Sequence, residues 1–361
     1  FHIFNSIQNT LFPWLEEALD PLSEKEQKFV QVLSLMDLET HMKAYRWKGK
    51  GRKRKNRLSM AKAFVAKAIY NFETTDILID YLRGCKNTRR LCGWENPWQV
   101  PSKSTFSRAF AQFSEGNLTQ DIHQAMVKEH CGEKLAGHIS RDSTAIAARE
   151  KPAKKKSDDS VAQSKRKPGR PRKGEVVAPK PPKRLDLQPT RSLEDNLKDL
   201  PTQCDVGTKK NSKGYKESWT GYKLHLDCID GDIPVSTILT SASLHDSQAA
   251  IPLSQMSQER ITNLYDLMDS AYDAPQIHSF SKNLGHKPII DHNPRRGENI
   301  YMDTATKARF AQRSSAERVN SYLKDNYGGR NIRVKGAAKV MTHLMFGIIA
   351  ITATQLFRLL E

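Results

Sequence analysis

The chain has 361 residues, which is enough to bury a full hydrophobic core and to form two or three units. Its formal net charge of +18 favours a polyanionic partner, and nucleic acid is the leading candidate. The longest apolar stretch runs from Leu344 to Phe357 and carries Thr352, Thr354 and Gln355. It is too short to span a bilayer, so it argues against a membrane protein and predicts a buried helix.

The five cysteines are an odd number, and no two of them form a Cys-x-x-Cys pair. This argues against a disulfide framework and against a structural zinc site. We therefore expect buried free thiols in a reducing compartment. The first residues show no secretory signal, and the missing initiator Met suggests a true start upstream or a trimmed end.

Residues 12–135 are predicted to be helical, because apolar residues recur at helical spacing in 29–38, 60–70 and 105–113. Ser102 or Ser104 is placed to cap the last of these helices. We assign residues 1–135 to a small all-α DNA-binding domain.

A basic loop is predicted inside this helical region. From Arg46 to Arg57, eight of the twelve residues are Lys or Arg, and Gly49 and Gly51 disfavour a helix. We expect a mobile loop that contacts DNA phosphates, with a merely solvated loop as the alternative. The candidate contacts are Arg52, Lys53, Arg54 and Lys55.

Residues 148–200 differ in composition from their surroundings. Their first part, Lys151 to Arg184, has thirteen basic residues, three acidic residues and six prolines, and it should be a disordered insert. Within it, Lys167-Pro168-Gly169-Arg170-Pro171-Arg172-Lys173 resembles the core of an AT-hook, although Pro168 stands where Arg is usual. In that motif an extended chain places arginines in a narrow A·T minor groove. Arg170 and Arg172 are therefore candidate DNA contacts, and nonspecific charge attraction is the alternative.

From about residue 138 the pattern changes to strands. The runs 138–147, 220–229 and 233–243 predict three antiparallel strands, and Asp230-Gly231-Asp232 predicts a tight turn between the last two. A helix (246–256), a strand (264–269), a helix (274–284) and a strand (287–291) follow. Residues 136–361 thus predict an α/β fold, a mixed five-stranded sheet flanked by helices in the order of an RNase H-like fold.

Two acidic residues lie in apolar strands of this layout. Asp142 is in the first strand and Asp269 ends the fourth. A carboxylate is costly to bury unless it is paired or binds a metal, and neighbouring strands would bring these two to one edge. Asp266 and Asp273 are alternatives to Asp269, but Asp266 shares a strand face with Met268 and Asp273 is in a helix-capping position.

The segment from Phe310 to Lys324 is predicted to be a helix with Arg313, Glu317 and Lys324 on one face. This helix can bring Glu317 to Asp142, and three converging carboxylates suit two divalent cations that act on a phosphodiester. The two cationic side chains would then bind phosphate oxygens. The alternative is a solvated helix stabilised by Arg–Glu and Glu–Lys pairs.

Other polar residues near these strands are assigned structural roles. Asp246 is placed to cap the helix that follows it. His225 is expected to be a structural histidine, and Asp227 is treated as a surface group.

The chain resembles the DDE transposases of bacterial insertion sequences, in the group with a Tyr-x2-Arg-x3-Glu-x6-Lys signature. Arg313, Glu317 and Lys324 match that spacing, with Phe310 in the place of Tyr. Further likeness lies in Asp269-Ser270-Ala271-Tyr272, Gly221-Tyr222-Lys223-Leu224-His225, Ser243-Leu244-His245-Asp246-Ser247, Arg90-Leu91-Cys92-Gly93-Trp94 and Ser102-Lys103-Ser104-Thr105-Phe106-Ser107-Arg108.

The resemblance implies that Asp142, Asp269 and Glu317 bind two Mg²⁺ ions, with Mn²⁺ as a substitute, and that Arg313 and Lys324 contact DNA near the transposon end. It implies an enzyme of the bacterial cytoplasm, associated with the nucleoid, that binds terminal inverted repeats, frees 3′-OH ends and joins them to target DNA. No membrane is expected, and a homodimer should form on paired ends. The alternatives are a catalytically inactive or domesticated DNA-binding relic and a stand-alone nuclease.

Overall fold

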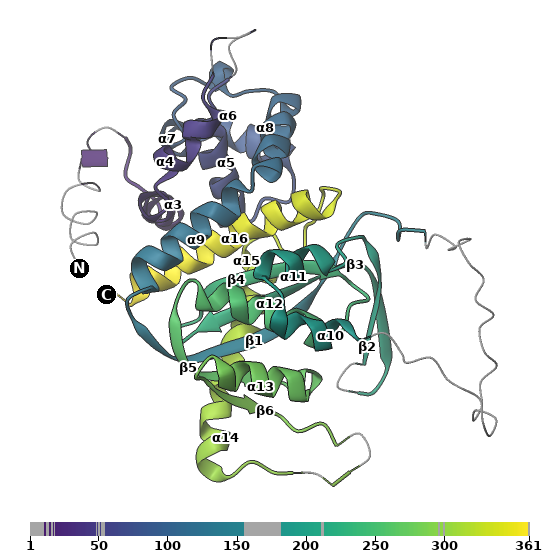
Figure 1. Cartoon of the computed structure of the whole chain (residues 1–361). Helices are drawn as coiled ribbons and strands as arrows, with labels where there is room; N and C mark the ends of the chain where they lie inside the picture. Colours follow the sequence, from purple (N-terminus) through teal and green to yellow (C-terminus); the bar gives the residue numbers. More distant parts are fainter. Residues whose placement is uncertain are drawn as a thin grey trace.

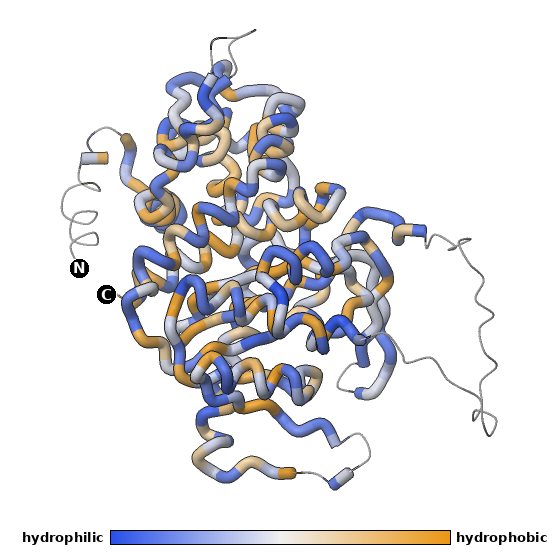
Figure 2. The backbone as a smooth tube through the Cα atoms, in the orientation of Figure 1, coloured by the Kyte–Doolittle hydropathy of each residue, from blue (hydrophilic) through white to orange (hydrophobic). Residues whose placement is uncertain are grey.

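The computed structural model describes residues 11, 14–15, 17, 19–47, 49, 51, 55–154, 182–210, 213–294, 297–298 and 300–359. Within them, a group of helices at the top of Figure 1 stands on a mixed sheet that carries further helices on its faces. Figure 2 shows that hydrophobic segments recur along α9 and along the strands of the sheet.

Short helices precede the sheet, and several begin at a capping side chain. Ser23 starts α3 with a capping box, in which its hydroxyl accepts the Glu26 N–H and the Glu26 carboxylate accepts the Ser23 N–H. Ser102 is the N-cap residue of α8, although its hydroxyl does not cap the backbone. These elements are α3 (Glu24–Leu35), α4 (Leu38–His41), η2 (Met42–Tyr45), α5 (Arg57–Ile69), α6 (Thr75–Gly84), α7 (Lys86–Leu91), η3 (Pro97–Gln99), α8 (Lys103–Glu115) and α9 (Leu118–Cys131).

The sheet has six strands in the described residues. They are β1 (Leu135–Ala147), β2 (Asp205–Lys210), β3 (Lys216–Ile229), β4 (Ile233–Ser241), β5 (Thr262–Met268) and β6 (Lys287–Ile290). Their order is β2-β3-β1-β5-β6, and β4 also pairs with β3. The pairs of β3 with β1, β2 and β4 are antiparallel, whereas β1–β5 and β5–β6 are parallel. This mixed sheet with helices on its faces is consistent with an RNase H-like fold.

The sequence analysis missed β2, so the predicted five-stranded sheet is one strand short. Gly221 on β3 pairs with Ala147 on one side and Asp205 on the other, while the following Tyr222 pairs with Ser241 of β4. β2 and β4 therefore share the edge of β3 that faces away from β1. β2 has mostly exposed, polar residues, and such a strand lacks the apolar alternation by which a sequence reveals a half-buried strand.

The predicted disordered insert does not extend to residue 200. Residues 184–199 form α10 (Arg184–Leu187), η4 (Gln188–Thr190) and α11 (Leu193–Asp199). Leu197 and Leu200 pack in a small core with Leu253 of α12. The apolar area that these leucines bury helps to offset the cost of ordering this part of the segment.

Helices lie on both faces of the sheet. α12 (Ser247–Gln258) and α13 (Pro275–Asn283) face one side, where Ser257 donates to Asp227 at 2.7 Å. α14 (Thr304–Phe310), η6 (Ala311–Arg313) and α15 (Ser314–Asn326) come later, and α15 covers the opposite face, where Asn320 donates to Asp142 at 3.0 Å. A short turn, η5 (Ser270–Tyr272), follows β5.

The last helix, α16 (Ala337–Arg358), joins the two parts of the molecule. It packs against α3, α5, α8 and α9 on one side and against β4 and α15 on the other. By length and composition it could cross a bilayer, but 83% of its most apolar window is buried inside the fold. The prediction of a buried helix at 344–357 is confirmed, within a helix longer than that apolar stretch.

All five cysteines are free thiols, and four of them are buried.

Candidate active site

The first two predicted acidic residues come from neighbouring parts of the sheet. β1 and β5 pair in parallel as far as Ser140 opposite Leu267, and Asp142 on β1 and Asp269, the residue just after β5, each lie two positions beyond that pair. Partners in a parallel register point to the same face of a sheet. The two strands are neighbours as predicted, and their carboxylates lie close enough for the charge of Asp269 to act on Asp142.

The charge state of Asp142 reflects this position. Burial, assisted by the charge of Asp269, raises the pKa of the Asp142 carboxyl to about 6. Burial also raises the pKa of Asp269, and the charges of Asp246 and Asp291 act in the same direction. Two carboxylates that repel one another in a partly buried site favour a cation between them.

The neighbouring aspartates are engaged elsewhere. Asp266 accepts hydrogen bonds from Ser281 at 2.5 Å and Asn263 at 2.9 Å, on the face opposite to Asp142. Asp273 accepts from the Asn293 N–H at 3.0 Å. The Asp269 carboxylate accepts the local Ala271 N–H at 3.0 Å, and Asp269 is the member of this group whose charge acts on Asp142.

The third predicted acidic residue, Glu317, forms an ion pair with Arg313, and the charge of Arg313 acts on the other two acidic residues. The Glu317 side chain is 52% exposed, and its Oε1 lies 2.5 Å from a guanidinium nitrogen of Arg313. The positive charge of Arg313 in turn acts on both Asp142 and Asp269. Arg313 thus links all three acidic residues electrostatically.

Asn320, which the sequence analysis did not single out, is the residue of α15 that contacts Asp142. It is 5% exposed, its amide donates to Asp142 Oδ2 at 3.0 Å, and its own Oδ1 is buried without a hydrogen-bond partner among the described residues. Asn320 follows Glu317 by three residues, which places both near one face of the helix. This three-residue spacing from Glu317 is the sequence feature by which Asn320 could have been predicted to lie at the site.

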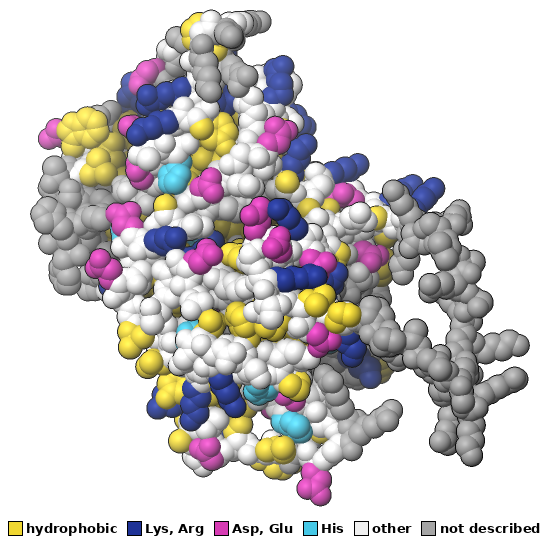
Figure 3. All heavy atoms as spheres, viewed as in Figure 1, with side chains coloured by type: hydrophobic (Ala, Val, Ile, Leu, Met, Phe, Trp, Pro, Cys, Tyr) yellow, Lys and Arg dark blue, Asp and Glu magenta, His cyan; other side chains and the backbone are white. Residues whose placement is uncertain are grey.

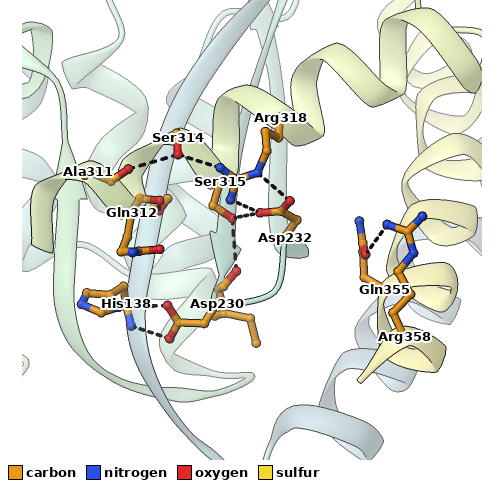
Figure 4. Close-up of polar contacts among 12 residues, drawn as sticks. His138, Asp230, Asp232, Ala311, Gln312, Ser314, Ser315, Arg318, Gln355 and Arg358 are labelled. Atoms are coloured by element: carbon orange, nitrogen blue, oxygen red, sulfur yellow. Dashed lines mark hydrogen bonds and ion pairs between the residues drawn. The ribbon is translucent and has the colours of Figure 1, made fainter. Parts of the chain in front are cut away.

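The position of α15 is set by the turn between β3 and β4. Figure 4 shows Arg318 and Ser315 pointing towards Asp232 in this turn. Arg318 donates to both carboxylate oxygens, at 2.7 and 2.6 Å, and Ser315 donates at 2.8 Å. Burial opposes ionisation of Asp232, but these hydrogen bonds outweigh it and hold its pKa below the usual value.

A cluster of cations lies beyond the acidic residues. Burial lowers the pKa of Lys324, and the charges of Lys209 on β2 and Arg330 lower it further. The charge of Asp142 acts on Lys324 in the opposite sense. Lys324 is therefore close enough to Asp142 and to other cations for their charges to act on it, and a bound phosphate oxygen would favour its charged form.

The other predicted DNA contacts lie mostly outside the described residues, namely Arg52, Lys53, Arg54, Arg170 and Arg172. Lys55 is exposed just before α5. Arg57, assigned to the basic loop, is instead buried in α5, where its guanidinium donates to Gln112 at 2.7 Å. On the face seen in Figure 3, basic and acidic side chains are intermixed, so the positive charge forms no single patch there.

Two structural assignments need correction. Asp227 is fully buried rather than exposed, and it accepts two hydrogen bonds from Arg141, at 2.8 and 2.7 Å. Asp246 forms no side-chain cap on α12, because its carboxylate binds Lys223 Nζ at 2.7 Å. His225 is structural as expected, since it is buried against Thr240 and burial lowers its pKa to about 4.

The donor chemistry suits a hard cation. Asp142, Asp269 and Glu317 offer oxygen ligands, which Mg²⁺ and Mn²⁺ prefer, and the orphaned Asn320 Oδ1 adds an unused acceptor beside Asp142. In the described part of the chain, however, no three His, Cys, Asp or Glu side chains are spaced to hold a metal ion. The acidic residues therefore fit a divalent cation by type, while Arg313 supplies the positive charge among them.

Two family models match the chain, one on each side of Asp142. Residues 176–353 match the model of the Transposase DDE domain, and residues 17–112 match the model of the Transposase domain (DUF772). No curated protein matches the chain. The fold and the two matched regions define a transposase. The chain belongs to the DDE transposases of insertion sequences, a family whose partner is DNA.

Proposed function

We propose that this transposase binds the terminal inverted repeats of its element, cleaves phosphodiester bonds to free 3′-OH ends and joins those ends to target DNA. The observation that carries the proposal is that Asp142 and Asp269 lie just beyond the end of the β1–β5 pairing, where the charge of Asp269 acts on Asp142, while Arg313 acts on both and is paired to Glu317. Because two ends must be handled together, we propose a homodimer on paired ends. Its place of action would be the bacterial cytoplasm, at the nucleoid.

Asp142, Asp269 and Glu317 are the residues that would hold Mg²⁺ or Mn²⁺. A pair of such ions, when bound, activates the attacking oxygen and stabilises the leaving oxygen. Glu317 would exchange its pairing with Arg313 for metal coordination, and the freed guanidinium would bind a phosphate oxygen. Asn320 would hold the Asp142 carboxylate in place through its 3.0 Å hydrogen bond.

Lys324 would bind the DNA backbone next to the acidic residues. Lys209 adds positive charge near it, whereas Arg330 is paired with Asp325, so a phosphate there would be attracted mainly by Lys324 and Lys209. The AT-hook-like segment and the basic loop are proposed to add contacts that do not depend on the acidic residues.

The substitution Asp142→Asn tests the catalytic assignment, because it keeps the shape and removes the charge. We expect Mg²⁺-dependent cleavage of element-end DNA to fall at least about 100-fold, while DNA binding in a gel shift is retained. The matched control is Glu259→Gln, which removes an exposed carboxylate beside α12 and should leave both properties unchanged. Cleavage by Asp142→Asn at the wild-type rate would remove Asp142 from the active site.

One observation favours the alternative of a catalytically inactive, DNA-binding transposase relic. Glu317 is paired with Arg313, and no three acidic side chains in the described residues are spaced as a metal site. Calorimetric titration with Mn²⁺ distinguishes the two functions. Binding of two ions that Asp142→Asn abolishes supports the enzyme, whereas the absence of binding supports the relic.

A further inference from the structure

A cavity of about 470 Å³ opens where the N-terminal helices meet the C-terminal part of the chain. Its walls come from α5, α6 and α8, from the residue Arg149 just after β1, and from the segment between α15 and α16. A volume of this size is typical of pockets that hold small ligands, which span about 300–1,000 Å³. None of the assigned acidic residues lines it.

One side of this pocket is aromatic. Its lining includes Phe64, Phe72, Phe110, Tyr327 and Phe346. Phe72 is the member of this set that is only partly buried, and its ring stacks on Tyr70 with centroids 5.4 Å apart. The ring also lies 4.9 Å from the ring of Tyr81, so two aromatic neighbours hold it in place at the pocket wall.

The rim of the pocket carries an excess of positive charge. Six cationic side chains face two acidic ones, Glu73 and Asp76, and each acidic group is already paired, with Arg333 and Lys103 respectively. Among the described residues, no ion pair neutralises the other four, which are Lys67, Arg149, Lys335 and Lys339. The pocket thus combines an aromatic wall with about four uncompensated cations.

Burial and the neighbouring positive charge disfavour the protonated form of Lys67. It is 9% exposed, its ammonium donates to the Glu73 carbonyl at 3.4 Å, and burial together with the charge of Arg333 lowers its pKa to about 8. A bound anion would favour the charged form. His343 in the same wall does not add a positive charge to bind the anion, because burial lowers its pKa to about 4. Its Nε2 forms a hydrogen bond with the Gly328 carbonyl.

The pocket is connected to the candidate active site by two elements. Arg149 follows Asp142 by seven residues along an extended chain, about 23 Å. Tyr327 follows Glu317 by ten residues at the end of α15, about 15 Å. Both spans are shorter than one turn of duplex DNA, about 34 Å, so DNA held at the acidic residues can also reach the pocket.

We propose that this pocket binds one unpaired nucleotide of the DNA substrate, with the base against Phe72 and the phosphate between Lys335 and Lys339. Both lysines are exposed at the start of α16, and the loop before it is held by a 2.8 Å hydrogen bond from the Gly336 N–H to Glu150. The inference depends on the proposed function only because it takes DNA as the substrate. A free nucleotide also has a base and a phosphate, so the test must distinguish a nucleotide within DNA from a free nucleotide.

The test compares binding of the full chain to a short DNA duplex with a single-stranded tail and to the same duplex without the tail, by fluorescence anisotropy in EDTA. Phe72→Leu keeps an apolar side chain but removes the ring. We expect it to weaken binding of the tailed duplex between about 5- and 150-fold and to change blunt binding by less than about twofold.

The double variant Lys335→Gln/Lys339→Gln should also weaken tailed binding and reduce the slope of log K against log salt by about 0.7, the value for one single-strand phosphate contact. Its matched control is Lys282→Gln, an exposed lysine on α13, which should have no effect on the tail preference. Thermal unfolding of each variant verifies that the fold is retained.

Equal losses for tailed and blunt DNA would overturn the proposal, because they indicate general charge attraction. Binding of dAMP as tight as that of tailed DNA, and sensitive to the same substitutions, would also overturn it in favour of a free nucleotide. The outcome is separate from that of the proposed function, since the assay contains no metal and measures binding without cleavage.

Discussion

At the residue scale, the position that makes Asp142 a candidate catalytic residue also lowers the stability of the folded chain. Its carboxyl is partly buried beside Asp269, and both effects favour the protonated form. Arg313 and Asn320 offset only part of this cost. A carboxylate that is held in this way gains more from a bound divalent cation than an exposed one would.

This cost predicts a pH-dependent gain of stability for Asp142→Asn. The pKa of Asp142 is about 6 in the folded chain and near 3.8 in the unfolded chain, so folding favours the protonated form and stability falls as pH rises through this window. We expect Asn to raise the free energy of unfolding at pH 7 by about 3 kcal/mol at most. Urea unfolding in EDTA measures this difference.

The same comparison near pH 3.5 should show almost no gain, because the wild-type carboxyl is then protonated in both states. A gain that is equal at both pH values would contradict the electrostatic cause. Loss of the gain on addition of Mn²⁺ to the wild type would be the expected sign of a metal bound to the carboxylate.

At the element scale, α15 presents its functional residues because two contacts anchor its first turns. Arg318 and Ser315 hold Asp232 in the β3–β4 turn, and Ser140 donates to the Gln312 carbonyl at 3.0 Å. Asp232 has a φ of 59°, in the left-handed region that a turn after Gly231 requires. The turn therefore serves both the hairpin and the helix that carries Glu317.

Removal of this anchor should affect activity more than folding. Asp232→Asn keeps the turn residue but removes its charge, and Asn tolerates the left-handed conformation. We expect a loss of about 1 kcal/mol in stability and a larger loss of cleavage, because Arg318 no longer orients α15. Cleavage and urea unfolding are measured on the same samples.

The control for Asp232→Asn is Lys198→Gln, which breaks an exposed pair with Glu194 on α11. It should change neither property. Unchanged cleavage in Asp232→Asn would show that the anchor does not position the site.

At the scale of the whole molecule, the N-terminal helices and the sheet share one core. A single cluster of buried residues runs from Phe29 and Phe64 through α16 to Leu226 on β3. The boundary expected near residue 135 is therefore a change in secondary structure, and α16 fills the space between the two parts. A shared core favours unfolding of both parts in one transition.

Ile348→Ala tests this coupling. The side chain is fully buried in the middle of α16, so we expect a loss of about 2–5 kcal/mol. Circular dichroism and tryptophan fluorescence should report the same shifted transition, since most tryptophans lie in the helical part. Leu359→Ala, at an exposed position after the same helix, is the control and should cost less than about 1 kcal/mol.

Two separate transitions in the wild type, with only one of them shifted by Ile348→Ala, would contradict the shared core. They would instead support independent units on either side of residue 135.

Much of the fold follows from the sequence alone. Strong local patterns predicted β1, the β3–β4 hairpin and the alternation of α12, β5, α13 and β6, because period and turn residues are local properties. The same reasoning placed Asp142 and Asp269 on adjacent strands, since the order of strands in a sheet follows from their connections.

Only the tertiary structure decided what those residues contact. It paired Glu317 with Arg313, placed Asn320 against Asp142, buried Asp227 on Arg141 and assembled the aromatic and cationic pocket from segments far apart in the chain. Such contacts depend on how a helix rotates and docks on a sheet, and packing across the whole core sets that rotation. The sequence determines which residues occur and in what order, whereas packing in the shared core determines which other residues they contact.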